Sequence, residues 1–349
     1  MTPACLLFEL AGRGSIALRG RDRASFLHGL VTNDVKKLVP GGGCAAAFLT
    51  AKGKLLAECV VLCEEERLVL DTPPELAATV EQLLRKYLVF NDVTISNETG
   101  DTRVFHLADD ADGKAAEDFL GRVMGPGAAT AAPVTPHAHA PALFAFSENL
   151  PPPGGAAGAA PPRSAGGGAI RIVRENRTGA PGWDLRCPSS LSKKLSSSLL
   201  VEGARLETPE RLEALRIAAG IPRWGAELTE SVLPDEAGLR ERGFVSDTKG
   251  CYVGQEIVAR IKTYGHVNRL LVGLSVFGGV PAAGEAVFFE GEKAGTLTSV
   301  APAPEGDTSA TAVALAFVKR ERAAEGTALT IPPPEEHLPP LRATVRSFV

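Results

Sequence analysis

Hydrophobic and polar positions repeat with two different periods along the first part of this chain, and each period predicts a type of element. Strand-like patterns occur at residues 15–20, 44–50, 55–63, 67–72, 92–98 and 102–108. Apolar positions three and four residues apart predict helices at residues 22–31, 73–89 and 114–124. This alternation of strands and helices predicts an α+β fold in which sheets pack against helices.

The second half of the chain changes character. Strands are expected at 169–176 and 182–188, on either side of a TGAPG turn, followed by helices at 189–200 and 207–220. From about Val267 only short strands between Gly and Pro turns remain, which is the signature of a small all-β barrel or sandwich. A chain of 349 residues is also long for one hydrophobic core, so two or three domains are expected.

Residues 151–169 interrupt both patterns. They read PPPGGAAGAAPPRSAGGGA and contain no apolar side chain large enough to anchor a core. Such a segment cannot offset the entropy lost on ordering, so it is expected to be a flexible linker.

Composition narrows the function classes. The formal net charge of −4 gives the whole chain no electrostatic footprint for nucleic acid. No stretch reaches the roughly 18 apolar residues that a membrane span needs, so no membrane association is expected. The six cysteines are scattered, which argues against a disulfide framework and a metal site. A monomer in the reducing cytoplasm is the expectation.

The densest group of chemically active residue types is KGCYVGQE at residues 249–256. Glycines near Cys251 let the backbone bend sharply, and the following QEIVARI has a helical pattern in which Glu256 can pair with Arg260. Cys251 would thus precede a helix N-terminus with Lys249 two residues away, and both features favour the reactive thiolate. Spacing alone leaves a functional thiol and a packed cysteine both open.

This motif resembles the K-G-C-[FY]-x-G-Q-E signature of YgfZ-type folate-binding proteins, which are relatives of the glycine-cleavage aminomethyltransferase. The similarity to that wider superfamily extends over most of the chain outside about residues 100–170. It is carried by residues 20–38, 216–227, 295–299 and 314–320.

The resemblance implies a three-domain aminomethyltransferase-like cradle around a central opening that holds tetrahydrofolate. The expected parts are a folate-binding domain from residues 1–50 and 170–265, an α+β sandwich at 51–150 and a C-terminal β-barrel at 266–349. Iron–sulfur client enzymes or assembly factors would be the protein partners.

The resemblance also implies site residues. Asp184 in GWDL matches a carboxylate that grips the pterin ring, Arg216 could meet the glutamate tail of folate, and Asn33 matches an Asn-Asp pair. A solvated acid, a structural partner for a buried acid and a local turn are the respective alternatives. Three further residues in and after the KGCYVGQE motif are expected at the cofactor: Gln255, Glu256 and Arg260.

The implied function is that of a folate-binding accessory protein for iron–sulfur cluster assembly or repair, and indirectly for tRNA modification, with Cys251 and Lys249 as the reactive pair. The alternative is a folate-dependent aminomethyl or one-carbon transferase. Ala57 speaks against it, because it stands where the transferases carry an acid, and its neighbour Glu58 would lie on the opposite face of the strand. A direct RNA-binding module is a third hypothesis, since residues 240–269 carry a small surplus of positive charge.

Overall fold

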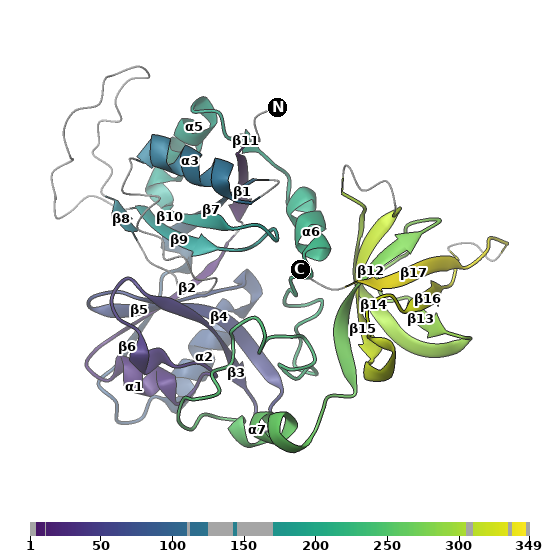
Figure 1. The fold of residues 1–349 in the computed structure, drawn as a ribbon. Coiled ribbons are helices and arrows are strands. Elements are labelled where there is room, and N and C mark those ends of the chain that lie inside the picture. The colour runs from purple at the N-terminus through teal and green to yellow at the C-terminus, as the bar shows by residue number, and fades with distance from the viewer. Residues whose placement is uncertain are drawn as a thin grey trace.

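The computed structural model describes residues 5–10, 12–109, 112–124, 142–144, 170–304, 310–333 and 337–346. They form a six-stranded sheet, a five-stranded sheet and a closed six-stranded barrel (Figure 1). The two sheets lie one above the other, and the barrel stands beside them. The expected linker at 151–169 lies outside the described residues.

The five-stranded sheet is antiparallel throughout, in the order β3-β4-β5-β2-β6. Its strands are β2 (Gly14–Arg19), β3 (Gly43–Leu49), β4 (Leu55–Cys63), β5 (Arg67–Thr72) and β6 (Thr94–Asn97). Helices α1 (Arg23–His28) and α2 (Ala77–Tyr87) cover one face, and their buried Leu27, Val80 and Leu84 join one core with alternate strand residues. The expected helices at 22–31 and 73–89 are therefore present but shorter than the pattern suggested.

The six-stranded sheet has the order β11-β1-β7-β10-β9-β8. Its strands are β1 (Leu6–Leu10), β7 (Thr102–Ala108), β8 (Ala142–Phe144), β9 (Ile170–Glu175), β10 (Gly182–Pro188) and β11 (Arg205–Leu206). Helices α3 (Lys114–Met124) and α5 (Ser192–Val201) cover one face, where the fully buried Trp183 lies in the core. Helix α6 (Pro209–Ala218) packs against this sheet through Leu212 and Leu215 and against the barrel through Ile217.

The C-terminal barrel confirms the expected all-β unit. It closes in the order β12-β15-β14-β13-β16-β17 and follows helix α7 (Gln255–Tyr264). Its strands are β12 (Arg269–Phe277), β13 (Ala286–Phe289), β14 (Glu292–Pro302), β15 (Ala312–Lys319), β16 (Ala328–Ile331) and β17 (Leu341–Arg346). Within the described residues, no helix is long and apolar enough to cross a membrane.

The sheets divide the chain differently from the expected domain segments. The expected boundary between residues 50 and 51 separates β3 from β4, yet these strands pair along most of their length. Strand β7, expected in the 51–150 segment, pairs with β10 from the 170–265 segment. The alternation of side chains indicates that a segment is a strand, but it does not specify the partner strand.

Candidate functional site

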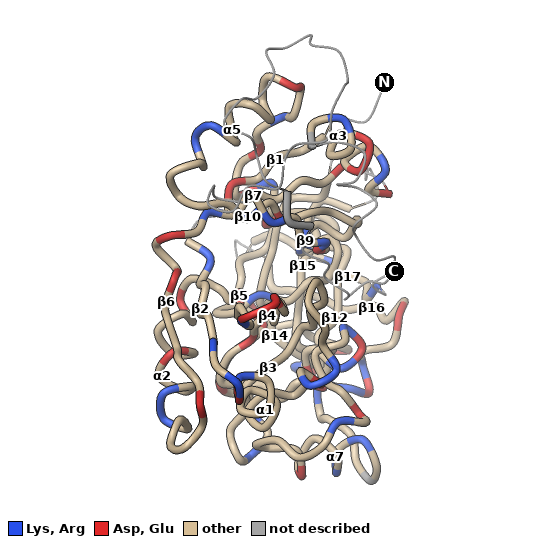
Figure 2. Tube along the Cα trace, turned by 90° about the vertical axis from the view of Figure 1, so that its left-hand side faces the viewer, with Lys and Arg blue, Asp and Glu red and all other residues tan. Residues whose placement is uncertain are grey.

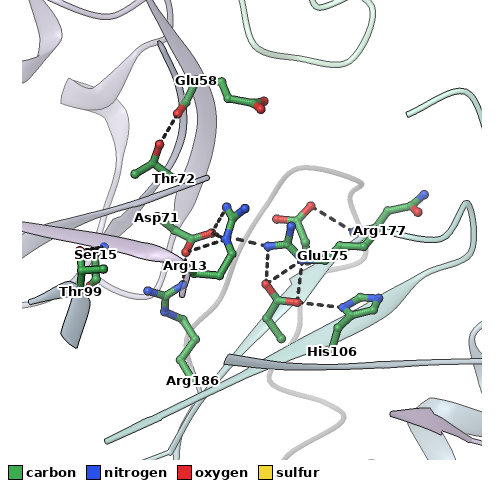
Figure 3. Close-up of polar contacts among 12 residues, drawn as sticks. Arg13, Ser15, Glu58, Asp71, Thr72, Thr99, His106, Glu175, Arg177 and Arg186 are labelled. Atoms are coloured by element: carbon green, nitrogen blue, oxygen red, sulfur yellow. Dashed lines mark hydrogen bonds and ion pairs between the residues drawn. The ribbon is translucent and has the colours of Figure 1, made fainter. Parts of the chain in front are cut away.

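The faces of the two sheets that carry no helix meet each other. Leu62 and Val69 of the five-stranded sheet pack with Val173 of the six-stranded sheet. Beside this apolar contact lies a group of polar side chains, shown in Figure 3, which we call the inter-sheet cluster. It consists of Arg13, Asp71, His106, Arg177, Asp184 and Arg186.

Asp71 of β5 contacts three arginines of the inter-sheet cluster. Arg13, just before β2, lies 2.6 Å from one carboxylate oxygen, and Arg186 of β10 lies 2.5 Å from the other. Arg177, in the turn between β9 and β10, is 3.5 Å away. Burial acts to raise the pKa of Asp71, but the arginines outweigh it and hold the pKa well below its usual range. Asp71 therefore joins the two sheets as an ionised carboxylate.

Asp184 of β10, expected to grip a pterin, is buried and fully engaged within the protein. Arg177 donates to both carboxylate oxygens at 2.6–3.1 Å, and His106 Nδ1 lies 2.8 Å from one of them. Burial opposes ionisation, yet Arg177 and His106 keep the pKa of Asp184 far below its usual range. A ligand that bonded this carboxylate would have to displace Arg177.

Ala57 and Glu58 lie on opposite faces of β4, as side-chain alternation requires. Ala57 is fully buried among the residues under α1 and α2. Glu58 is half-buried on the face that carries the inter-sheet cluster, close enough for Arg13 and Arg177 to influence it electrostatically. An acid at residue 57 would thus enter an apolar core, whereas Glu58 has the position from which a carboxyl group could meet a polar ligand.

The Glu58 carboxyl group makes no hydrogen bond or ion pair with the described residues, and Figure 3 shows it extending away from the arginines. Burial raises its pKa to about 7, although Arg13 and Arg177 act in the opposite direction. At neutral pH both protonation states are populated, so this group can donate or accept a proton.

Arg216 and Asn33 have structural partners. Arg216 of α6 is buried and donates to the carboxylates of Glu213 and Glu227, at 2.7 and 3.0 Å, and to the Ser299 hydroxyl of the barrel at 2.7 Å. The amide nitrogen of Asn33 donates to two backbone carbonyls, and its oxygen accepts from the Asp34 N–H. The buried-acid alternative describes the contacts of Arg216. Asn33 bonds locally to Asp34 but also joins its turn to the carbonyls of Ala45 and Gly243, so it is more than a local turn. A folate role for either residue stays a prediction.

The loop that carries Cys251 is anchored by Lys249. The Lys249 amine donates to the carbonyls of His28 and Val31, each at 2.5 Å, and lies over the Tyr252 ring. Burial lowers the pKa of Lys249 to about 8, so the amine is still mainly protonated at pH 7. Lys249 thus fixes the loop against the end of α1 and also interacts electrostatically with Cys251, and its part in a reactive pair stays a prediction.

Cys251 itself is exposed, in contrast to the other cysteines. Four of the others are buried and Cys44 is half-buried. Burial raises the pKa of all five, to about 12 for Cys5 and Cys44 and to about 11 for Cys187. Accessibility thus singles out Cys251 as the candidate nucleophile.

Helix α7 does not bring its expected cofactor residues to the inter-sheet cluster. Glu256 and Arg260 form the predicted i,i+4 ion pair at 3.0 Å, with 82% and 65% of their side chains exposed. Gln255 is the first residue of the helix. Figures 1 and 2 both draw α7 at the bottom of the view and β10 in its upper half. Gln255, Glu256 and Arg260 follow Cys251 in the chain and lie apart from Asp184, and a role for them at the cofactor stays a prediction.

Five residues of the inter-sheet cluster were not predicted from the sequence: Arg13, Asp71, His106, Arg177 and Arg186. A signal was present, because the strand runs LVLDT, VFHLA and WDLRC each carry ionisable side chains within apolar sequence. Such side chains in strands buried on both faces predict a polar contact between layers. Within the described residues, no group of three or more His, Cys, Asp or Glu side chains could hold a metal ion.

We expect iodoacetamide to modify Cys251 at least about tenfold faster than any other cysteine at pH 7.5, because the thiol is exposed. Peptide mass spectrometry after timed quenching measures the six rates. In urea all six should react at similar rates, which serves as the control. Equal rates for Cys44 and Cys251 in the folded protein would contradict the assignment.

The chain is similar in sequence to several known proteins. Residues 269–349 match the model of the glycine cleavage T-protein C-terminal barrel domain. An aminomethyltransferase of Geobacillus kaustophilus is 29% identical over 327 residues, covering 92% of this chain and 80% of the relative. The Arabidopsis thaliana protein named "Putative transferase At1g60990, chloroplastic" is 26% identical over 329 residues, covering 93% and 68%.

A solved structure shows the same fold. The crystal structure of the glycine cleavage system aminomethyltransferase T from Bartonella henselae superposes with a TM-score of 0.78, at 19% identity, covering 99% of this chain and 86% of that one. The YgfZ-type assignment within this group stays a prediction. The chain has the fold of an aminomethyltransferase, is similar in sequence to aminomethyltransferases over 92% or more of its length, and matches at residues 269–349 the model of the glycine cleavage T-protein C-terminal barrel domain.

Proposed function

We propose that this protein binds tetrahydrofolate and supports iron–sulfur cluster assembly or repair through the thiol of Cys251. The observation that carries the proposal is the exposure of Cys251, on a loop anchored by Lys249, in a fold shared with aminomethyltransferases. Its partners would be iron–sulfur enzymes or their assembly factors.

The residues between the sheets are compatible with a folate ring. Arg186 is buried, and its Nε and Nη2 have no hydrogen-bond partner within the described residues, so a ligand acceptor that reached them would satisfy two unpaired donors. The Glu58 carboxyl is unpartnered among the described residues and could accept hydrogen bonds from an aminopyrimidine edge. Asp184 fits this role less well, because Arg177 and His106 already engage it. The reduced pterin would supply one-carbon chemistry, while these residues bind and orient it.

A one-carbon transferase is the second candidate, and Glu58 is the observation that favours it. A carboxyl group with a pKa of about 7 can exchange a proton with a bound ligand at neutral pH. The two functions differ in the residue they require: the transferase needs Glu58, and the accessory function needs Cys251.

Cys251→Ala is expected to keep tetrahydrofolate binding and to abolish rescue of a strain that lacks its own YgfZ-type protein. Isothermal titration measures the first effect, and the activity of an iron–sulfur enzyme in the rescued strain measures the second. Cys63→Ala, which removes a buried thiol, is the matched control and should rescue fully. Full rescue by Cys251→Ala would refute the thiol role, and absence of folate binding by the wild type would refute the folate role.

A further inference from the structure

A pocket of about 530 Å³ lies between the barrel and the segment that follows α6. The segment contributes Ala226, Thr229, Ser231 and Val232, and the barrel contributes residues of β12, β14 and β15. Its volume is in the range of small-molecule sites. The inter-sheet cluster contributes no residue to its lining, so this is a separate place in the fold.

Three cationic side chains line the pocket, and no acidic residue does. Arg269 is already neutralised, because its guanidinium donates to both carboxylate oxygens of Glu236 at 3.0 and 3.3 Å and covers the Phe317 ring. Lys293 and Lys319 have no ion-pair or hydrogen-bond partner within the described residues. The pocket therefore carries about two uncompensated positive charges at neutral pH.

The two lysines come from adjacent strands. Lys293 lies in β14 and Lys319 ends β15, and the pairing of Gly295 with Val318 brings these strand ends together. Both side chains line the same pocket, so one bound anion could contact both ammonium groups. Gly295 also keeps the strands close, since a Cβ there would lie 2.3 Å from the Phe317 carbonyl oxygen.

Neutral groups complete the lining. The hydroxyls of Thr229 and Ser231 lie 2.9 Å apart, so one of them keeps a donor for a ligand. The Thr296 hydroxyl has no hydrogen-bond partner within the described residues. Val232, Ala294 and the Phe317 ring supply apolar surface. Ammonium and hydroxyl donors beside an apolar wall suit a compact organic anion.

We propose that this pocket binds a small polyvalent anion, with its acidic groups on Lys293 and Lys319 and its remaining atoms against Phe317. Carboxylate and phosphate groups share the chemistry that these donors recognise. Citrate and pyrophosphate are therefore the two probes. The probe that binds with the higher affinity identifies the chemical class of the ligand, carboxylate or phosphate.

The experiment titrates each probe into the full-length protein by calorimetry at low ionic strength. We expect saturable binding of at least one probe, weakened when sodium chloride rises from about 0.05 to about 0.5 M, because salt screens exposed charges. The variant Lys293→Gln/Lys319→Gln should bind about tenfold more weakly, since each lost ammonium group removes a charge-assisted hydrogen bond. Lys114→Gln, an exposed lysine on α3, is the matched control and should bind as the wild type does.

Failure of both probes to bind, or unchanged affinity in the double variant, would overturn the proposal. A further titration adds saturating tetrahydrofolate before the anion. Unaltered anion affinity supports a separate site, whereas competition would make the pocket part of the folate site and overturn its independence. The first anion titrations contain no folate. They can therefore be interpreted even if the protein does not bind folate.

Discussion

Replacing Asp71 with asparagine is expected to lower the free energy of unfolding by about 3–5 kcal/mol, the range for breaking a buried ion pair by removing one partner. Arg186 is 4% exposed, and Asp71 is its ion-pair partner within the described residues. Asparagine has nearly the same shape but no charge, so the variant leaves the guanidinium buried without a carboxylate. Urea-induced unfolding followed by circular dichroism measures the difference.

Two comparisons make this test specific. Glu256→Gln removes an exposed ion pair and should change the free energy of unfolding by less than about 0.5 kcal/mol. Asp71→Asn/Arg186→Met removes both charges and should recover part of the loss, because the fully buried Arg186 charge is no longer left alone, while the partly exposed Arg13 still loses its carboxylate. A loss below about 1 kcal/mol for Asp71→Asn would show that the cluster does not hold the sheets together.

The contribution of Asp71 to the free energy of unfolding is also expected to depend on pH in a defined range. The folded-state pKa of Asp71 lies below the ordinary aspartate pKa of 3.8, so its contribution to stability is fully present above that pH. As the pH falls through the lower folded-state value, the carboxylate is protonated and the contribution is lost. The difference between wild type and Asp71→Asn should therefore stay constant from about pH 5 to 8.

Glu58→Gln is expected to stabilise the protein by about 1–3 kcal/mol at pH 8, with no effect at pH 4. Burial raises the pKa of Glu58 from 4.5 to about 7, so keeping its charge in the folded state costs free energy. Below pH 4.5 the group is neutral in both states and costs nothing. The cost grows between pH 4.5 and 7 and is constant above pH 7, and glutamine removes it.

The measurement is the free energy of urea unfolding of wild type and variant at several pH values. Glu256→Gln, at an exposed position of α7 far from Glu58, is the control and should show no such pH dependence. Destabilisation by Glu58→Gln at pH 8 would mean that Glu58 is a paired, ionised carboxylate. The same variant tests the transferase alternative, which predicts loss of one-carbon transfer despite the gain in stability.

Local patterns in the sequence determined the types of the main elements. The helices at 73–89 and 114–124, the strands of the C-terminal barrel and the Glu256–Arg260 pair were all predictable. Each depends on interactions between residues close in the chain, or on side-chain periodicity, which sequence spacing specifies. Alternation also predicted that Ala57 and Glu58 lie on opposite faces of one strand.

Only the tertiary structure decided what each face meets. Ala57 is buried in an apolar core because α1 and α2 pack on its face of β4. Glu58 faces the inter-sheet cluster because the opposite face of β4 meets the second sheet. Asp71 and Arg186 are 115 residues apart in sequence, and Lys249 reaches backbone carbonyls more than 200 residues away. Such contacts depend on which strands and loops become neighbours, and nothing in the local pattern of one segment specifies its partner.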